Sequence, residues 1–500
     1  MKCRRLTRIQ AFVLLAVLSI PVGLAAQDKK DHDQHHSYEL IDVGTLGGPN
    51  SYFIFGVGIN KHGTVVGFAD TSIPDPFAPN CFIDCFVNHA FKWEQGVLTD
   101  LGALTPGVSS GAGLINKSGL VAGLSQNGVI DPLTGIPELF ATVWQNGQVI
   151  NLGTFGGNNS YSNDLNDAGQ AVGFGATTTP DSFNLGDFCF FGPLPTQILA
   201  FIWQNGVMQN LGTLGGPDSC ALMINDKGQV AGNSFTNSTP NPVTGTPTLD
   251  PFLWEHGHMI DLGTLGGTQG YLGNMITLNS HGEVVGQSNL AGDLTFHPFR
   301  WTKSTGMQDL GTLGGDNGAA MAINDAGEIV GVADVTGTQI HHAFLWTKEA
   351  GIRDLGTQDR DPCGWAQAVN KSGQIVGGTQ SDCINFSHAF LWEDGGPMID
   401  LNTFVPAGSD LTLTEAVLIT DSGEIAVQAA LPNGDQHAVL LIPCDEHHDD
   451  SDCKDGSDSV RPVPQVSPVS RDVFSTTRSL FPPSQTSRLR FPGRALGPAN

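Results

Sequence analysis

One short motif recurs eight times along this chain and constrains its fold more than any other feature. Each copy begins with Asp or Asn, continues in most cases with Leu-Gly, and usually ends with Thr-Leu-Gly-Gly. The copies lie about 45 to 60 residues apart, a spacing typical of arrays of supersecondary units that bury their apolar faces against one another. They are Asp42–Gly48, Asp100–Leu104, Asn151–Gly157, Asn210–Gly216, Asp261–Gly267, Asp309–Gly315, Asp354–Gln358 and Asp400–Phe404.

The stretch between two copies of the motif predicts four short strands. In the sixth repeat the runs are Ala319–Asn324, Glu328–Val332, His342–Trp346 and Gly351–Asp354. Gly, Asn and Asp separate these runs, and no window shows the apolar period of a helix. The chain also contains 64 glycines, which favour turns over helices. The sequence therefore predicts an all-β protein.

A second motif, Asn-x-x-Gly, lies between the first and second strands of each repeat and predicts a hairpin turn. The Asn side chain can accept hydrogen bonds from nearby backbone N–H groups, and Gly can adopt a positive φ. We interpret these asparagines as structural rather than as ligands for a bound molecule. The turns are Asn60–Gly63, Asn116–Gly119, Asn166–Gly169, Asn225–Gly228, Asn279–Gly282, Asn324–Gly327 and Asn370–Gly373, with Thr420–Gly423 as a degenerate eighth copy.

The third strand of most repeats carries Phe and Trp two residues apart. Strand alternation places both rings on one face of the sheet, while the Ala and Leu between them face the other way. Because both faces are apolar, four-stranded sheets stacked face to face are expected, which is a β-propeller. An aromatic binding stripe is the alternative, and the regular repetition favours packing. The pairs are Phe91 and Trp93, Phe201 and Trp203, Phe252 and Trp254, Phe299 and Trp301, Phe344 and Trp346, and Phe390 and Trp392; Trp144 follows Thr142, and Val439 with Leu441 replaces the pair in the last repeat.

The two ends of the repeat region predict how the propeller closes. Tyr38–Val43 matches only the fourth strand of a repeat, and Thr414–Ile442 matches only the first three. The N-terminal strand can therefore complete the last sheet and leave no unpaired edge. This gives eight blades of four antiparallel strands. Seven blades is the alternative if one copy is misassigned, and an open superhelix is a third possibility that the split repeat disfavours.

The connection between the second and third strands varies most in length. In an up-and-down sheet it shares a face with the connection from the fourth strand to the next blade. Insertions on one face of a repeat protein often mark its binding face. We therefore expect ligands at this face of blades one to four. The long connections are Ala69–Asn88, Leu124–Glu138, Gly175–Ile198 and Asn233–Asp250, and shorter ones follow at Asn289–Phe296 and Asp334–Ile340.

Eight cysteines remain once Cys3 is removed with the predicted signal peptide. An even number in an exported protein indicates disulfides, and the 105 possible pairings are narrowed by where each cysteine falls in the repeat. Their spacing fits no familiar zinc site, which is the alternative. The predicted pairs are Cys81 with Cys85, Cys189 with Cys220, Cys363 with Cys383, and Cys444 with Cys453.

The chain ends differ in character from the repeats. Residues 1–26 combine Lys2, Arg4, Arg5 and Arg8 with an apolar run that ends in small residues. This is typical of a cleaved secretory signal peptide, with an uncleaved anchor as the alternative. No other run is long enough to span a membrane. We predict a disordered linker at 27–37, the propeller at 38–442, and a disordered tail at 443–500, first rich in Asp and His and then in Pro, Ser and Arg.

The charge of the chain excludes some partners. Its 49 Asp and Glu against 23 Lys and Arg give a net charge of −26. Nucleic acid and anionic membrane surfaces are disfavoured, since both require a basic patch.

No catalytic motif of a serine hydrolase, a phosphate-binding loop or a zinc protease is present. Asp449–Asp458 does not keep the register of a calcium-binding loop. The histidines His89, His297, His342, His388 and His437 recur at the start of the third strand and are interpreted as structural. A catalytic pair of carboxylates of the glycosidase kind remains an alternative among the acidic residues of the loops. These are Asp75, Asp84, Asp131, Asp181 and Asp187.

Three linked motifs carry a resemblance to a known family. Asp-Leu-Gly-Thr-Leu-Gly-Gly, Ile-Asn-x-x-Gly-x-Val-Val-Gly and His-Ala-Phe-Leu-Trp recur in order over residues 38–442. This combination resembles the HAF-repeat family of extracellular bacterial proteins, whose triplet stands at His89–Phe91, His342–Phe344 and His388–Phe390; His297–Phe299 departs from it. The resemblance implies an exported repeat protein of unassigned activity and supplies no catalytic residues.

The functional prediction follows from the one-sided insertions and from the missing catalytic motifs. We predict a monomer, secreted or periplasmic, that binds a protein or a glycan without catalysis and without a cofactor or metal. The alternative is an extracellular polysaccharide hydrolase or lyase on the same scaffold, and a purely structural envelope component is a third reading.

Overall fold

The computed structural model describes residues 37–444, apart from 54–57, 184, 186–188, 190–193, 274, 338–339, 359–360 and 394. The predicted signal peptide, the linker up to His36 and the tail beyond Cys444 lie outside the described residues. Within the described part of the chain, no helix has the length and apolarity that a membrane crossing requires.

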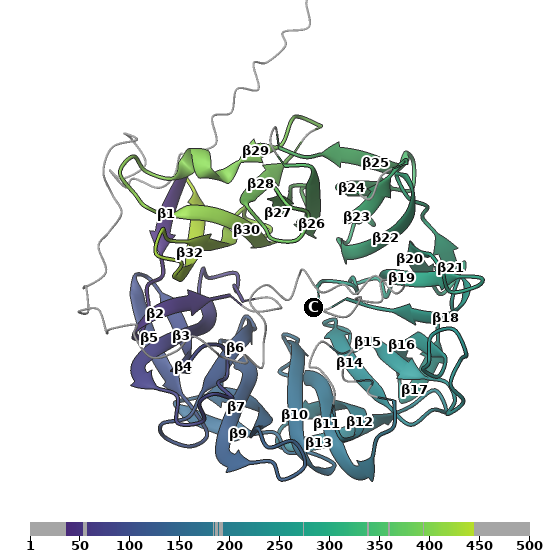
Figure 1. Cartoon of the computed structure of the whole chain (residues 1–500), viewed down its shortest axis with the longest axis horizontal. Helices are drawn as coiled ribbons and strands as arrows, with labels where there is room; N and C mark the ends of the chain where they lie inside the picture. Colours follow the sequence, from purple (N-terminus) through teal and green to yellow (C-terminus); the bar gives the residue numbers. More distant parts are fainter. Residues whose placement is uncertain are drawn as a thin grey trace, which may run out of the picture. The chain divides into compact units, whose positions relative to one another are not determined.

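The described chain is built of antiparallel four-stranded sheets, which confirms the all-β prediction and the β-propeller architecture (Figure 1). One sheet has eight strands, because a single parallel bridge between Leu249 and Gln269 joins two four-stranded groups. We number the groups as blades 1 to 8 in chain order. The first four are β2 (Gly47–Tyr52), β3 (Val65–Pro74), β4 (Phe86–Glu94) and β5 (Val97–Gly102); β6 (Ser110–Ile115), β7 (Val121–Ile130), β8 (Pro137–Gln145) and β9 (Gln148–Asn151); β10 (Gly156–Leu165), β11 (Ala171–Pro180), β12 (Thr196–Gln204) and β13 (Val207–Gly212); and β14 (Ser219–Ile224), β15 (Val230–Phe235), β16 (Leu249–Glu255) and β17 (His258–Asp261).

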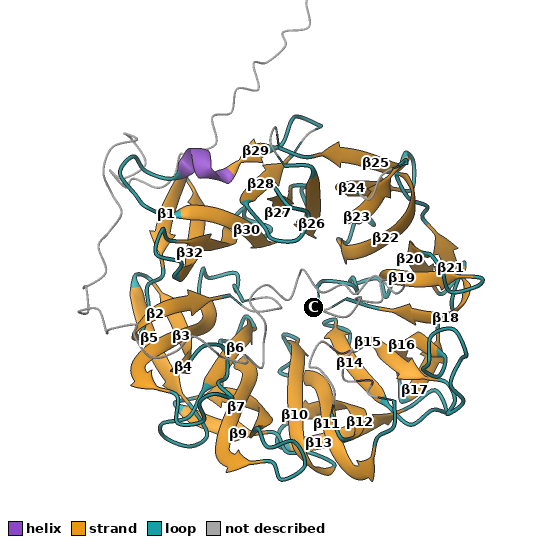
Figure 2. Ribbon diagram, viewed as in Figure 1, coloured by secondary structure: helices purple, strands orange, loops and turns teal. Residues whose placement is uncertain are grey.

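The remaining four blades follow the same order of strands, with one irregularity. In blade 7 the fourth strand is only two residues long and leads into a 3-10 helix, η2 (Leu401–Phe404), drawn in purple in Figure 2. The sequence predicted an ordinary motif copy here. Asn402 replaces the usual Gly, and Asp400 caps the helix by accepting from the backbone N–H of Asn402. These blades are β18 (Gly266–Tyr271), β19 (Val284–Leu290), β20 (Phe296–Thr302) and β21 (Gly306–Asp309); β22 (Gly314–Ile323), β23 (Ile329–Val335), β24 (His341–Thr347) and β25 (Gly351–Gly356); β26 (Cys363–Val369), β27 (Ile375–Gln380), β28 (His388–Trp392) and β29 (Ile399–Asp400); and β30 (Thr412–Ile419), β31 (Ile425–Ala430), β32 (Gln436–Pro443) and β1 (Tyr38–Asp42).

The N-terminal strand closes the ring as predicted. Strand β1 pairs antiparallel with β32, from Tyr38 opposite Pro443 to Asp42 opposite Val439. The propeller thus includes Pro443, which the sequence had assigned to the tail.

The seam between blades 8 and 1 repeats a contact found between consecutive blades. The backbone N–H of Ala438 donates to Ser51 Oγ at 3.0 Å. Ala90, Ala141 and Ala200 donate in the same way to Ser110, Ser160 and Ser219 of the next blade. The closing interface therefore has the geometry of an ordinary one.

A Phe ring packed over a Gly forms the centre of most blades. Phe344 is fully buried and lies opposite Gly331 in the neighbouring strand. A Cβ at Gly331 would stand 2.1 Å from the carbonyl oxygen of Ala319 and 3.0 Å from the Phe344 ring. In blade 8 both positions differ: Val427 replaces the Gly, Val439 replaces the Phe, and the two valines pair with each other. A larger residue on one strand offsets a smaller one on the next, so the packed volume is kept.

The Asn-x-x-Gly turns link each blade to the next one. Asn324 Oδ1 accepts the backbone N–H groups of Ala326 and Glu328, while its Nδ2 donates to the carbonyl oxygen of Asn370 in the following blade. Because the same amide holds both the turn and the neighbouring blade, the structural interpretation of these asparagines is confirmed. The equivalent contacts to the next blade are made by Asn60, Asn116, Asn166, Asn225, Asn279 and Asn370.

Candidate functional site

The propeller has two faces of different construction. We define the loop face by the connections from second to third strands and from fourth strands to the next blade. At this face the first strand of a blade meets the connection between the second and third strands: Asn50 Nδ2 donates to Asp84 Oδ2 at 2.6 Å. The turn face carries the other two kinds of connection, which also meet, as where Thr64 Oγ1 donates to Glu94 at 3.1 Å.

Three hairpins project from the loop face in blades 1 to 3. Strands β3, β7 and β11 each have ten residues, and the last three residues of each are exposed. The sequence predicted irregular loops here, whereas strand pairing resumes at Pro74 opposite Phe86 and at Ile130 opposite Pro137. A β-ladder supplies partners for backbone groups that a loop would leave to solvent. The candidate binding surface therefore stands on strand extensions.

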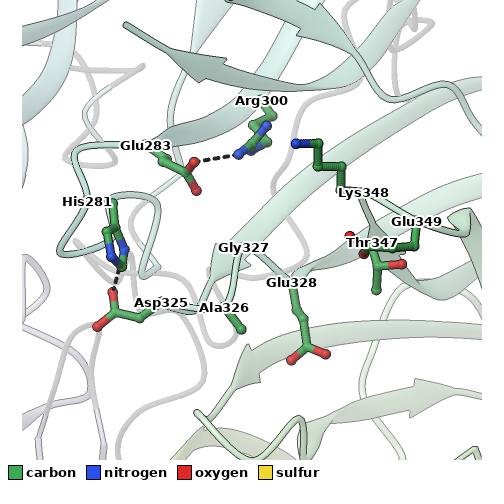
Figure 3. A pocket seen from close by; sticks show the side chains of 10 residues that line it. All are labelled: His281, Glu283, Arg300, Asp325, Ala326, Gly327, Glu328, Thr347, Lys348 and Glu349. Carbon is green, nitrogen blue, oxygen red and sulfur yellow. Dashed lines mark hydrogen bonds and ion pairs between the residues drawn. The ribbon is translucent and has the colours of Figure 1, made fainter. Parts of the chain in front are cut away.

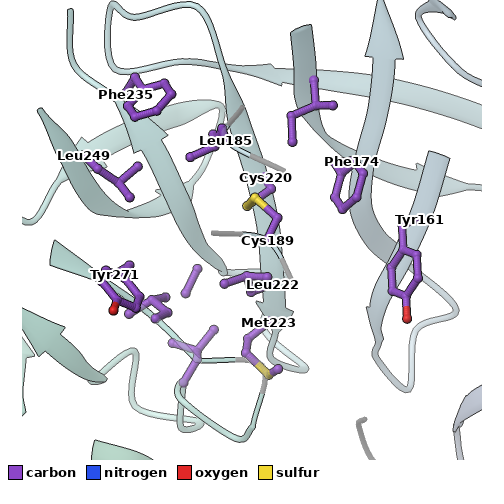
Figure 4. Close-up of a cluster of buried hydrophobic side chains, with 14 of the residues drawn as sticks. Tyr161, Phe174, Leu185, Cys189, Cys220, Leu222, Met223, Phe235, Leu249 and Tyr271 are labelled. Atoms are coloured by element: carbon purple, nitrogen blue, oxygen red, sulfur yellow. A yellow bond between two sulfur atoms is a disulfide. The ribbon is translucent and has the colours of Figure 1, made fainter. Parts of the chain in front are cut away.

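Disulfides fix the same face. Cys81 bonds to Cys85, Cys189 to Cys220 and Cys363 to Cys383, which confirms three predicted pairs. Figure 4 shows the Cys189–Cys220 bond among Phe174, Leu185 and Leu222, so the blade 3 connection is tied into the core beside blade 4. Cys444 is also disulfide-bonded, but its predicted partner Cys453 lies outside the described residues.

Exposed apolar side chains gather on the loop face. Among described residues, Val97 and Val207 are the only large exposed hydrophobic side chains that lie elsewhere, at turns of the opposite face. The loop-face group is aliphatic, and no tryptophan belongs to it. These side chains come from blades 1, 2, 4, 5 and 7, and three of them belong to blade 2. The group consists of Ile73, Val129, Ile130, Leu133, Val243, Leu294 and Ile384.

The Lys and Arg side chains that the structure describes lie toward the other face. Among described residues, the loop-face connections contain Asp and Glu but no Lys or Arg. Four lysines lie in Asn-x-x-Gly turns and two in turns between third and fourth strands, and the rest pair with groups near those turns. The loop face is therefore acidic with aliphatic tips. The cationic residues are Lys61, Lys92, Lys117, Lys227, Arg300, Lys303, Lys348, Arg353 and Lys371.

Two carboxylates meet at the loop face of blade 1. Asn50 Nδ2 donates to both Asp70 and Asp84, at 2.9 and 2.6 Å, and Asn88 Nδ2 also donates to Asp70. Burial, and next the charge of Asp84, raises the pKa of Asp70 well above its usual range. Sequence analysis singled out Asp84 but missed Asp70, which lies inside a strand. Asp70 is fully buried, so it holds the loop and lacks the access to substrate that an acid catalyst needs.

The other predicted loop carboxylates serve local structure. Asp75 accepts the backbone N–H groups of Phe77 and Phe82, and Asp131 accepts that of Leu133. Asp181 accepts the N–H of Phe183, and Asp187 lies outside the described residues. These are Asx turns of the kind that shape loops. Within the described chain, no three His, Cys, Asp or Glu side chains converge as a metal site requires.

The recurring histidines form ion pairs within their blades. His89 Nδ1 lies 2.8 Å from Asp100, the first residue of the next motif copy, which ties the third strand to the fourth. Where the His is absent the Asp is absent too, since blade 2 has Phe140 with Asn151. This supports the structural interpretation of the histidines. Equivalent pairs are His297–Asp309, His342–Asp354 and His437–Asp42, while His388 pairs with Asp361 instead of Asp400.

Blade 4 carries the exception to this pairing. Asp250 occupies the His position and faces Asp261, so two carboxyl groups meet. Burial, and next the charge of Asp261, raises the pKa of Asp250 to about 7. One oxygen of Asp250 is buried without a hydrogen-bond partner. Protonation of Asp250 removes the repulsion between the two facing carboxylates.

One pocket of about 440 Å³ lies on the turn face, between blades 5 and 6 (Figure 3). Glu283 pairs with Arg300 in its wall, and His281 lies 3.9 Å from Asp325. Its lining is polar and its charges are largely matched within the wall. This is not the face at which the sequence predicted ligand binding.

Comparison with known proteins adds little to this geometry. No family model matches the chain, and no curated protein is similar to it. A solved structure that aligns with it is the X-ray structure of a protein proposed to be a gluconolactonase. That alignment covers 49% of this chain and 81% of the other at 9% identity, with a TM-score of 0.27. At this similarity the comparison bears on neither activity nor ligand.

Proposed function

We propose that this chain is an exported, non-catalytic binding module of the HAF-repeat type whose loop face takes a protein partner. The observation that carries the proposal is the concentration of exposed aliphatic side chains on that face. Disulfide bonds support export, because they persist in oxidising compartments.

The chemistry of the tips favours a protein over a glycan or a membrane. Aliphatic side chains gain binding free energy by burial against apolar surface, about 25 cal/mol per Å². Sugars offer little such surface, and anionic lipids would be repelled by an acidic face.

The alternative activity, polysaccharide hydrolysis or elimination, draws less support. It would require a pair of accessible carboxyl groups near the channel or in the loops. The carboxyl pair of blade 1 includes the fully buried Asp70, and several other loop carboxylates are engaged by backbone N–H groups.

A matched pair of substitutions tests the proposal. Leu133 on the loop face and Val97 on the turn face are both 62% exposed. The unaltered full-length protein and its Leu133→Lys and Val97→Lys variants are each used to capture secreted and envelope proteins of the source organism. Captured proteins are identified by mass spectrometry and then purified, so that their affinity for each variant can be measured. We expect binding to fall at least tenfold with Leu133→Lys and to stay unchanged with Val97→Lys.

Two results would argue against this function. Equal loss with both variants would mean that the loop face is not the binding surface. New reducing ends after incubation with a glycan panel would instead favour the hydrolase or lyase.

A further inference from the structure

The last forty residues of the chain have the opposite charge to the loop face, whereas the stretch 445–458 before them is acidic. Residues 461–500 contain six arginines and a single acidic residue, Asp472. Apolar side chains alternate with the arginines, above all at Arg488-Leu-Arg-Phe-Pro-Gly-Arg494. A cationic segment with interspersed Leu and Phe is the chemical complement of an acidic surface with aliphatic tips. The arginines are Arg461, Arg471, Arg478, Arg488, Arg490 and Arg494.

The loop face presents carboxylates able to receive such a segment. Among the described residues, partly or fully exposed acidic side chains occur in the loop-face connections, or in the strand ends beside them, of most blades. Arg binds carboxylates through paired hydrogen bonds, which gives geometric as well as electrostatic selectivity. The carboxylates are Asp84, Glu138, Asp181, Asp316, Asp334, Asp382, Asp410 and Asp435.

We propose that residues 461–500 dock on the loop face of their own chain, with Arg488–Arg494 at the centre of the contact. The arginines pair with the exposed carboxylates, and Leu489 and Phe491 cover aliphatic tips such as Leu133 and Val243. The inference rests on the proposed function, because it takes the same surface.

The chain is long enough for this contact. Strand β32 has eight residues and runs from the loop face to the turn face, so the tail departs about 27 Å from its target. About 40 residues separate Cys444 from Arg488. At about 3.3 Å per residue a chain of that length can reach more than about 100 Å, so its length permits the contact. The tether also gives the segment a local concentration in the millimolar range, which an untethered competitor must exceed.

A peptide competition measures the contact. A fluorescent peptide of residues 461–500 is titrated into the full-length protein and into a full-length variant with all six tail arginines changed to Gln. We expect the Gln variant to bind the peptide and the unaltered protein to bind it at least tenfold more weakly, because its own tail occupies the face. Affinity should fall steeply between about 20 and 300 mM NaCl, as screening weakens charge pairing.

Matched double variants locate the binding surface. In the Gln background, Leu133→Lys with Val243→Lys changes loop-face residues that are 62% and 63% exposed. Val97→Lys with Val207→Lys changes turn-face residues that are 62% and 67% exposed. We expect peptide affinity to fall at least tenfold in the first pair and to be unchanged in the second.

Three outcomes would overturn the inference. In the first, the Gln variant fails to bind the peptide. In the second, both double variants lose peptide binding equally. In the third, analytical sedimentation at rising protein concentration shows that the tail binds a second copy of the chain. Partner capture separates this failure from that of the proposed function. If capture still depends on Leu133 while the peptide does not bind, only the docking of the tail is wrong.

Discussion

Residues at two contacting positions of the repeat vary together from blade to blade. His at the start of a third strand occurs with Asp in the next motif copy, whereas Leu199 occurs with Asn210. A lone Asp at that place would lack the partner that stabilises its charge. Asp250 with Asp261 breaks this rule, so a second carboxyl group stands where most other blades place an imidazole.

We predict that Asp250→Asn stabilises the protein at pH 8 and not at pH 4. The folded-state pKa of about 7 lies above the ordinary value of 3.8, so the folded state binds the extra proton and stability falls as pH rises from about 4 to 7. Asn cannot ionise and escapes this loss, which amounts to roughly 2–4 kcal/mol for such a shift.

Thermal unfolding of both proteins followed by circular dichroism between pH 4 and 8 checks this. Asp164 and Asp218, whose pKa values burial also raises, to about 6 and about 7, are common to both proteins and cancel in the comparison. A difference between the two midpoints that does not grow with pH would contradict the prediction.

At the scale of elements, a glycine in the second strand of most blades permits the close approach of the first strand and of the Phe ring. We predict that Gly331→Ala destabilises the protein by about 2–3 kcal/mol, since the added methyl meets a backbone carbonyl that cannot yield without moving a strand. Urea unfolding measures the loss. Gly273→Ala is the control, because a Cβ there meets nothing within 4 Å, and a comparable loss at Gly273 would refute the packing argument.

The sequence predicted elements well where the repeat imposes them and poorly where a single copy departs from it. Strand pairing, closure by β1 and three disulfides follow from register alone. The extended hairpins do not, because Pro74 and Pro137 suggest loops, although a strand tolerates Pro at its first residue, as Pro137 in β8, or after a register shift, as Pro74 in β3. Asp70 was missed for a related reason: a strand residue becomes a partner of Asp84 only when the connection folds back over it.

At the scale of the whole molecule, the polarity of the two faces was present in the sequence once the repeat register was known. Every described Lys lies in or beside a turn-face connection, and the described residues of the loop-face connections include no Lys or Arg; Arg360 belongs by sequence to one of these connections but lies outside the described residues. Local strand formation does not require this separation, since both kinds of connection are exposed. The difference in charge between the two faces therefore relates to the molecules that each face binds. It is the physical basis of the proposed binding surface and of the proposed docking of the cationic residues 461–500.

The interface between blades 8 and 1, where the ring closes, lacks the asparagine hydrogen bond that joins the other consecutive blades. Seven asparagines each donate to the following blade, but position 420 is Thr, whose hydroxyl accepts the Glu424 N–H and has no amide to extend to Asn60. We predict that Thr420→Asn adds this bond and stabilises the protein by about 1 kcal/mol. The carbonyl of Asn60 accepts only the N–H of Gly63 among backbone donors, as its equivalents do, so it retains a lone pair for the new donor.

The reciprocal change provides the control for this last prediction. Asn370→Thr keeps a hydroxyl for the turn and removes the donor to the carbonyl of Thr420, which should cost roughly 1–2 kcal/mol. Urea unfolding of both variants measures the two effects under one condition. If Asn370→Thr destabilises and Thr420→Asn leaves stability unchanged, the seam between blades 8 and 1 differs in geometry from the other interfaces. If both shift as expected, the ring is held at its closure by the same contact that joins its other blades.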